Sequence, residues 1–179
     1  AVLKNLFPQG GEIIVPPFTW ISDIVSIIYN GFVPKFADIN FTNLSMNANE
    51  ILKKVNKKTK AVFLTHAQGF NGLSSYLIKE LKKKRIHLIE DVSESHGASF
   101  GKKKLGSFGI ISNFSFYYAH HMSTIEGGMI CTNNREIYEK LRMMRSHGLV
   151  REIKYKKLKN QYIKKFPHLN PKFIFGLQG

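Results

Sequence analysis

Short apolar runs alternate with amphipathic stretches over the first hundred residues of the chain. Apolar runs predict strands, and a spacing near 3.6 residues predicts helices, so the order strand, helix, strand repeats. The strands are expected at 12–15, 33–38, 61–66 and 87–91, and the helices at 20–30, 47–55 and 73–84. This alternation predicts an α/β fold with a mostly parallel sheet flanked by helices on both sides.

The helix expected at 73–84 has one clear apolar face. Leu73, Tyr76, Leu77 and Leu81 recur at i, i+3, i+4 and i+8, so we expect them to be buried together. Beyond residue 91 the pattern changes to short strands at 113–116 and 128–131 and a helix over 135–145, with its buried face formed by Ile137, Leu141 and Met144. From residue 150 onward the helical signal is weak.

The strand at 87–91 ends in the carboxylate pair Glu90-Asp91. Ligands of open parallel sheets bind beyond the carboxyl ends of the strands. A carboxylate at that place could hold the protonated nitrogen of a pyridine ring, as an electron-sink cofactor requires. The alternative interpretation of Asp91 is a helix cap or a solvated loop acid.

Two further segments carry candidate chemistry. Adjacent His120 and His121 follow a strand, and imidazole suits acid-base catalysis near neutral pH, although a histidine that packs or caps fits the spacing as well. Zinc is not favoured, because adjacent histidines diverge and no HExxH pattern or partner cysteine accompanies them. Trp20, just after a strand, could stack on a planar ring or start a helix as a core side chain.

Composition limits the classes of function. The chain has 179 residues, 27 Lys and Arg against 12 Asp and Glu, and a net charge of +15. That charge raises nucleic acid or an anionic membrane as partners, but the lysines are spread along helical stretches, which favours a solvated surface. One cysteine, Cys131, allows no internal disulfide and no metal site of its own, so we expect a cytoplasmic protein without a metal. No run of 18 apolar residues exists, so we expect no membrane partner. The spread of the lysines also leads us to expect no nucleic-acid partner.

The segments taken in order resemble a known family. GEIIVPPFTW (11–20), KTKAVFLTHAQG (58–69), HLIEDVSESHGASFGKKKLGSFG (87–109), SFYYAHHMSTIEGGMICTN (115–133) and LRMMRSHG (141–148) are similar to the DegT/DnrJ/EryC1/StrS sugar aminotransferases. The resemblance implies an aspartate-aminotransferase-like fold and pyridoxal 5'-phosphate. It also implies a piece of a longer protein: residues 1–148 would be the cofactor-binding large domain, incomplete at its N-terminus, and 149–179 the start of a linker to a small C-terminal domain.

One departure from the family pattern changes the expected reaction. The aminotransferases place a cofactor-binding lysine where this chain has His120, whereas a similar His-His pair occurs in a subgroup of sugar 3-dehydratases that work with pyridoxamine 5'-phosphate. By that resemblance, the C3 hydroxyl is removed from a nucleotide-linked 4-keto-6-deoxyhexose, and glutamate regenerates the amine. The setting would be deoxysugar and lipopolysaccharide biosynthesis, in a homodimer.

The resemblance also assigns roles to individual residues. His120 would be catalytic, Asp91 would pair with the pyridine nitrogen, Trp20 would stack on the ring, Glu94 would lie near the ring hydroxyl, and Ser115 would bind the phosphate. An iron-sulfur cluster, present in a related dehydratase, is disfavoured because no cysteine follows Cys131.

Three other hypotheses stay open from the sequence. One is an aminotransferase that uses a lysine elsewhere, with 102–104 as candidates. Another is a basic protein that holds nucleic acid, and the third is a catalytically inactive binding or dimerising homologue.

Overall fold

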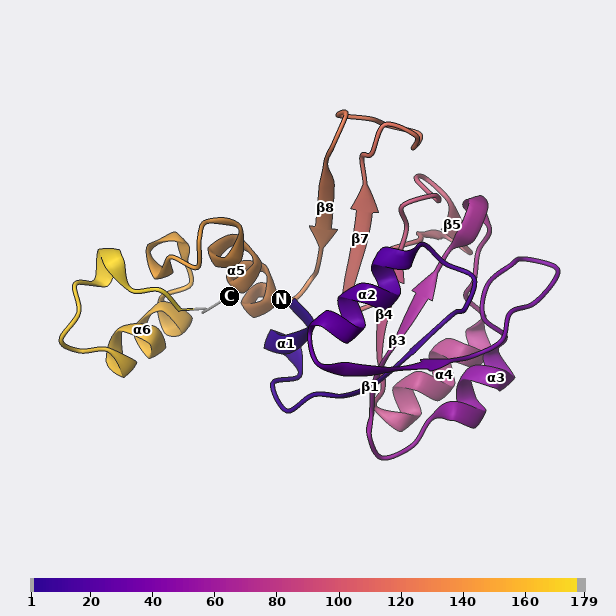
Figure 1. Ribbon diagram of the computed structural model, residues 1–179, viewed down its shortest axis with the longest axis horizontal. Coiled ribbons are helices and arrows are strands. Elements are labelled where there is room, and N and C mark those ends of the chain that lie inside the picture. Colours follow the sequence, from indigo (N-terminus) through magenta and orange to yellow (C-terminus); the bar gives the residue numbers. More distant parts are fainter. Residues whose placement is uncertain (1, 177–179) are drawn as a thin grey trace.

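In this computed structural model residues 2–176 are described, and six strands form one sheet in the order β2-β1-β3-β4-β7-β8 (Figure 1). The first five strands of that order are parallel to their neighbours, and β8 runs antiparallel to β7. The strands are β1 (Gly11–Val15), β2 (Phe32–Phe36), β3 (Thr59–Thr65), β4 (His87–Asp91), β7 (Ile111–Ser115) and β8 (Gly128–Cys131). The predicted mostly parallel α/β sheet is confirmed.

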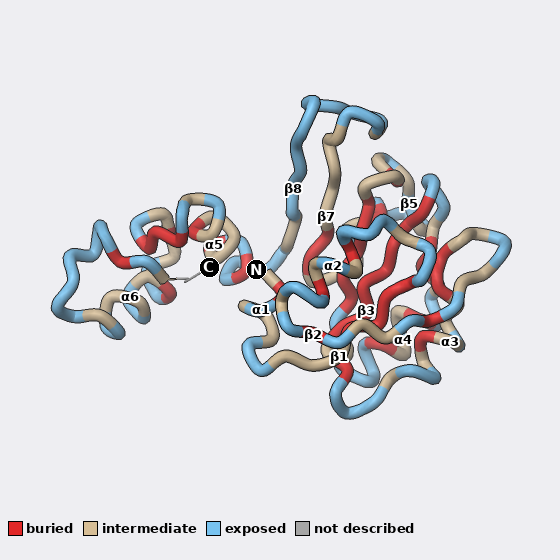
Figure 2. The backbone as a smooth tube through the Cα atoms, viewed as in Figure 1, coloured by how far each residue is buried: buried red, intermediate tan, exposed pale blue. Residues whose placement is uncertain are grey.

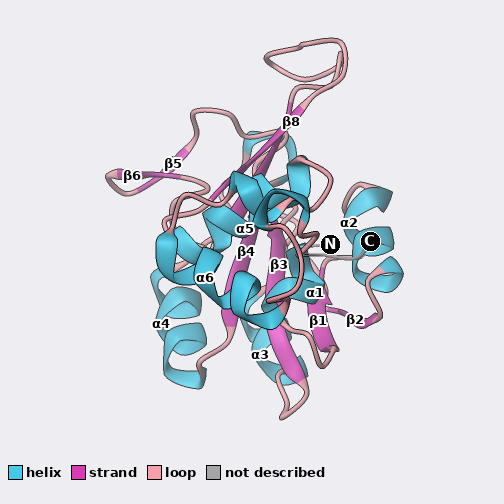
Figure 3. Ribbon diagram, turned by 90° about the vertical axis from the view of Figure 1, so that its left-hand side faces the viewer, coloured by secondary structure: helices cyan, strands magenta, loops and turns pink. Residues whose placement is uncertain are grey.

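Helices cover both faces of this sheet. Neighbouring residues of a strand point to opposite sides, so the apolar strands have a face for helices to pack on at each side. Ile14 of β1 joins a core with α3 (Ala48–Lys54) and α4 (Ser75–Lys84), whereas Ile13 and Val15 join a second core with α1 (Val2–Leu6), α2 (Ile21–Tyr29) and α5 (Arg135–Arg145). Figure 2 shows β3 and β4 as buried strands, and Figure 3 shows the sheet strands between the helices.

The connection between β7 and β8 projects beyond the rest of the molecule (Figures 1 and 3). Its residues, from His121 to the start of β8, are exposed. A small hairpin of β5 (Ser99–Phe100) and β6 (Lys103–Lys104) lies between β4 and β7 in the sequence. The chain leaves the sheet at the carboxyl end of β4 for the hairpin and at the carboxyl end of β7 for the long connection, and this is the edge of the sheet at which a ligand is expected.

The C-terminal segment has a small core of its own, formed by Met143, Val150, Ile153, Leu158 and Ile174. It brings together the end of α5, the short helices η2 (Val150–Glu152) and η3 (Pro171–Phe173), and α6 (Lys156–Lys165). The sequence predicted helix only weakly in this segment, whereas the structure contains the ten-residue helix α6. Only Leu158 of that helix is buried, so its sequence shows little periodicity even though packing holds it.

Most predicted elements are present with ends that differ by one or two residues, and two burial predictions were wrong. Tyr76 is 53% exposed, while Leu73, Leu77 and Leu81 are buried as expected, because the i+3 position lies at the margin of the face of α4. On α5 the fully buried methionine is Met143 instead of Met144, since Met143 faces the C-terminal core. No helix among residues 2–176 is long and apolar enough to cross a membrane.

Candidate functional site

The carboxyl ends of three parallel strands meet at Asp91. In the sheet register Asp91 of β4 lies opposite Thr65 of β3 on one side and Asn113 of β7 on the other. Asp91 is 5% exposed, and its Oδ1 accepts hydrogen bonds from the Ser93 amide at 2.9 Å, the Ser93 hydroxyl at 2.6 Å and the Asn113 amide nitrogen at 2.7 Å. All three donors bind the same oxygen of the carboxylate. The alternative of a solvated acid does not fit this burial.

A second buried acid, Asp23, lies against this carboxylate. It is the third residue of α2 and 4% exposed. Its Oδ2 accepts hydrogen bonds from the Thr19 hydroxyl at 2.6 Å and the Thr65 hydroxyl at 3.1 Å. Burial, together with the neighbouring charge of Asp91, raises the pKa of Asp23 to about 8. The site therefore contains two buried carboxyl groups, one of which, Asp23, holds a proton more readily than an ordinary aspartate.

Glu90 precedes Asp91 and points to the opposite face of the sheet, where it orders the loop before β7. Its fully buried carboxylate accepts a hydrogen bond from His66 Nε2 at 3.1 Å and from the backbone amides of Gly106 at 2.8 Å, Phe108 at 2.8 Å and Gly109 at 2.6 Å. Burial by itself raises the pKa of Glu90, but these hydrogen bonds outweigh it and lower the pKa below the ordinary value. The Glu90–His66 pair therefore stabilises β4 on the face of the sheet opposite Asp91.

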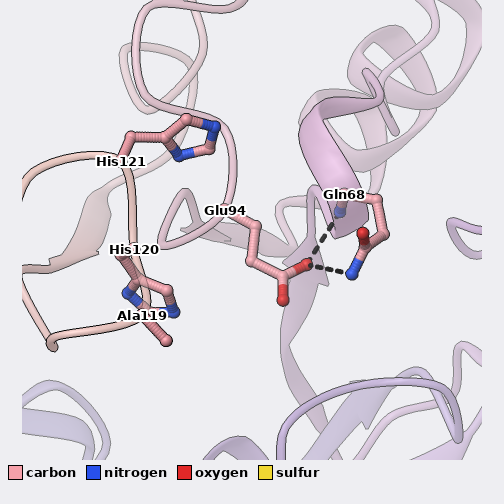
Figure 4. A pocket seen from close by; sticks show the side chains of 5 residues that line it. All are labelled: Gln68, Glu94, Ala119, His120 and His121. Carbon is pink, nitrogen blue, oxygen red and sulfur yellow. Dashed lines mark hydrogen bonds between the residues drawn. The ribbon is translucent and has the colours of Figure 1, made fainter.

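An open pocket of about 370 Å³ is lined by Gln68, Glu94, Ala119, His120 and His121. Figure 4 shows Glu94 between Gln68 and the loop that carries both histidines. Glu94 Oε2 accepts hydrogen bonds from the Gln68 backbone amide at 2.7 Å and its side-chain nitrogen at 3.4 Å. Nδ1 of His120 is buried and has no hydrogen-bond partner among the described residues. Such an atom is free to take part in proton transfer.

His96 adds a third imidazole to this region. Its ring lies 5.7 Å from the His121 ring and 5.8 Å from each of the Phe114 and Phe116 rings. Burial, followed by the neighbouring His121 and His120, lowers the pKa of His96. The three histidines do not form a metal centre: among residues 2–176 no cluster of three or more His, Cys, Asp or Glu side chains could hold an ion.

The remaining predicted residues lie at the same edge of the sheet, outside the lining of the pocket. Trp20 immediately precedes α2 and is 72% exposed, so the alternative of a core tryptophan was wrong. Ser115 ends β7, and its hydroxyl accepts a hydrogen bond from the Tyr117 amide at 3.3 Å. The structure thus brings together Glu94 and His120 in one pocket and places Asp91 in a buried polar cluster beside it.

Sequence reasoning missed Asp23, Thr65, Ser93 and Asn113, which surround Asp91. One signal was available for Asp23. It lies four residues before the buried Ile27, on the buried face of an otherwise apolar helix, where an acid needs a partner. The roles of Thr65 and Asn113 had no such signal, because they depend on which strands are neighbours in the sheet.

Comparison with known proteins identifies the family. The model of the DegT/DnrJ/EryC1/StrS aminotransferase family matches residues 2–171. This chain belongs to that family. It is 34% identical over 176 residues to GDP-4-keto-6-deoxy-D-mannose 3-dehydratase of Escherichia coli O55:H7, covering 98% of this chain and 45% of that relative.

Two other family members are similar to this chain. A GDP-perosamine synthase of Escherichia coli O157:H7 is 33% identical over 149 residues, which are 83% of this chain and 41% of that relative. The solved structure of the E. coli GDP-4-keto-6-deoxy-D-mannose 3-dehydratase with bound hydrated PLP superposes with a TM-score of 0.78 at 33% identity, covering 85% of this chain and 41% of the other. The chain therefore spans less than half the length of these family members.

Proposed function

We propose that this chain forms part of a sugar 3-dehydratase that uses pyridoxal and pyridoxamine 5'-phosphate. The observation that carries the proposal is His120. It lies in the loop after β7, where the family resemblance expects a lysine, and it lines the pocket with a buried Nδ1 that has no partner among the described residues. An imidazole cannot hold the cofactor covalently as a lysine amine does, but it can move protons.

The surrounding residues fit such a cofactor. Asp91 is a buried carboxylate, and no Lys, Arg or His of residues 2–176 forms an ion pair with it, so it suits the protonated nitrogen of a pyridine ring. Trp20 offers an exposed ring face for stacking, Glu94 would lie near the ring hydroxyl, and the Ser115 hydroxyl would bind the phosphate. When bound, the cofactor supplies an amine and an electron sink.

His120 would act as a general base and acid in this proposal. It would remove a proton from the C4′ carbon of the cofactor and return a proton to the departing C3 hydroxyl of the sugar. The pocket is open, so a sugar can reach His120 from solvent. Glutamate would restore the amine after each turnover.

The names of the relatives support a proposal for the substrate class. The dehydratase and the perosamine synthase both carry GDP-sugar names, so we propose a GDP-linked 4-keto-6-deoxyhexose as the first substrate to test. A homodimer in the cytoplasm, acting in the biosynthesis of a surface polysaccharide, belongs to the same proposal. The division into a large cofactor domain (1–148) and the start of a linker (149–179) remains a prediction, and residues 177–179 lie outside those described.

The second candidate is a nucleotide-sugar aminotransferase. The observation in its favour is that the perosamine synthase is 33% identical to this chain and the dehydratase 34%, so identity alone does not separate them. The two reactions differ in product: an aminotransferase leaves the nitrogen on the sugar, whereas a dehydratase releases it as ammonia.

An ammonia assay distinguishes these functions. The full-length protein is mixed with pyridoxal 5'-phosphate, glutamate and GDP-4-keto-6-deoxymannose, and ammonia and sugar products are measured. We expect ammonia release, reduced about 100-fold or more in His120→Asn because general acid-base catalysis is lost. His147→Asn is the matched control, since His147 is exposed at the end of α5, and it should leave the rate unchanged.

Other outcomes of this assay have definite meanings. A stable amino-sugar from the unaltered protein, without ammonia, would establish an aminotransferase and refute the role of His120. Neither product, together with an absorption spectrum that shows no bound cofactor, would support an inactive homologue.

A further inference from the structure

Asp23 and Asp91 form a buried pair of acids, and the proposed reaction uses only Asp91. Asp23 comes from the first turn of α2 and Asp91 from the end of β4. They are 4% and 5% exposed. Thr65, which lies opposite Asp91 in the register of β3 and β4, donates its hydroxyl to Asp23 at 3.1 Å, so the two acids lie at the same end of these strands. A carboxylate oxygen has no hydrogen to donate, so two carboxyl groups bond to each other only when one carries a proton.

The hydrogen-bond donors around the pair show which acid carries this proton. Asp91 Oδ1 receives three donors, two from Ser93 and one from Asn113. Asp23 receives only the hydroxyls of Thr19 and Thr65, both on its Oδ2. Donors stabilise the charged form of a carboxylate, and burial favours the neutral form of the acid with fewer of them. Asp23 is therefore the protonated member.

The surroundings supply no positive charge that would alter this assignment. Glu90, adjacent to Asp91 in β4, faces the other side of the sheet and pairs with His66. No Lys, Arg or His among residues 2–176 forms an ion pair with Asp23 or Asp91. Asp91 is the titratable group that acts on Asp23, and the Thr19 and Thr65 hydroxyls are its other polar neighbours. Two like charges in such a place are strongly disfavoured.

We propose that Asp23 is a positioning residue that shares one proton with Asp91, so that the pair presents a single negative charge to the ring nitrogen of the cofactor. The identity of that ligand rests on the proposed function, whereas the protonation of Asp23 rests on its burial and on the few donors around it. In this arrangement Asp23 donates to Asp91, Asp91 accepts from the protonated ring nitrogen, and no buried charge is left without a partner.

The protonation of Asp23 can be measured in the cofactor-free, full-length protein. Infrared spectroscopy detects the carbonyl band of a buried protonated carboxylic acid. We expect such a band well below the Asp23 pKa of about 8 and its loss as the pH rises through that value. Asp23→Asn should remove the band, because the amide has no titrating proton. Asp38→Asn is the control, since Asp38 is exposed.

A second variant keeps the proposal testable if Asp23→Asn does not fold. The Thr65 hydroxyl lowers the pKa of Asp23, so Thr65→Val should shift the midpoint of the band upward and leave the band itself in place. The absence of an acid band in the unaltered protein below pH 8, or its persistence in Asp23→Asn, would overturn the proposal.

The bound cofactor gives an independent readout. Asn mimics a protonated Asp23, so the absorption spectrum of the cofactor bound to Asp23→Asn should match that of the unaltered protein below about pH 8 and differ from it above. Identical spectra at all pH values would contradict the proposal. If the protein shows the acid band but releases no ammonia, the proposal of the carboxyl pair stands and the proposed dehydratase function fails. The two proposals can therefore fail separately.

Discussion

Two buried carboxyl groups of this protein have pKa values shifted in opposite directions. Glu90 accepts hydrogen bonds from His66 and three backbone amides, which lower its pKa despite burial. Asp23 is nearly as buried, and its burial and the neighbouring Asp91 raise its pKa to about 8, because the hydroxyls of Thr19 and Thr65 lower that pKa too little to compensate. The number of donors and the sign of the nearest charge decide the protonation state, and burial alone does not.

The pKa of Glu90 predicts a specific dependence of stability on pH. Because its folded-state pKa is lowered, its stabilisation is complete above the ordinary value of 4.5 and is lost as the pH falls through the lower folded-state value. Glu90→Gln should lower the free energy of unfolding near neutral pH by about 1–3 kcal/mol, because the new amide group cannot accept all four donors. It should also flatten the acid limb of the stability curve.

Urea unfolding across this pH range measures both effects. Glu136→Gln is the matched control, since the exposed Glu136 only pairs with Lys140 on the surface of α5. An acid limb that stays as steep in Glu90→Gln as in the unaltered protein would show that another group is responsible.

At the scale of elements, α5 connects the sheet to the C-terminal core. Its N-cap is Asn134, whose side-chain oxygen accepts hydrogen bonds from the backbone amides of Glu136 at 2.9 Å and Ile137 at 3.1 Å. Ile137 packs on the sheet and Met143 on the C-terminal core. A change in the first turn of α5 is therefore expected to affect both the core on the sheet and the C-terminal core.

The cap gives a prediction for this element. Asn134→Ala should reduce the free energy of unfolding by about 1 kcal/mol, because two backbone donors lose their acceptor. Asn134→Asp should retain the stability, since the carboxylate accepts the same hydrogen bonds and suits the positive end of the helix dipole. Chemical denaturation of both variants measures the difference, and equal losses in the two would mean that the cap contributes nothing.

For the whole molecule, the C-terminal core is distinct from the two cores of the sheet. Met143 is fully buried in it, whereas Leu77 is fully buried between α4 and the sheet. Met143→Ala should cost about 2–5 kcal/mol in its own core and open the segment around Val150 and Ile153. Hydrogen exchange should show faster exchange there and unchanged protection in β3 and β4.

Leu77→Ala provides the comparison for that experiment. It should weaken protection in β3 and β4 and leave the C-terminal segment less affected. Equal loss of protection in both regions from either variant would show that the molecule unfolds as one cooperative unit.

The sequence was sufficient for the order of elements and for part of the site. Strands and helices follow from the period of apolar residues, and Asp91 stands out because it ends an apolar strand. His120 stands out only through the family resemblance, which implies a lysine at its position. These features are local, so a linear sequence contains them. Tyr76, Met144 and α6 were misjudged because their burial depends on the neighbouring element, which no local period specifies.

What only the tertiary structure decided is the surroundings of Asp91. Asn113 reaches it because β7 lies beside β4, and Thr65, opposite Asp91 on the neighbouring β3, donates its hydroxyl to Asp23 of α2. These contacts join residues far apart in the chain. The sequence determined which residues could carry charge, and the fold decided which charges would meet, because a pKa depends on distance, burial and donors in three dimensions.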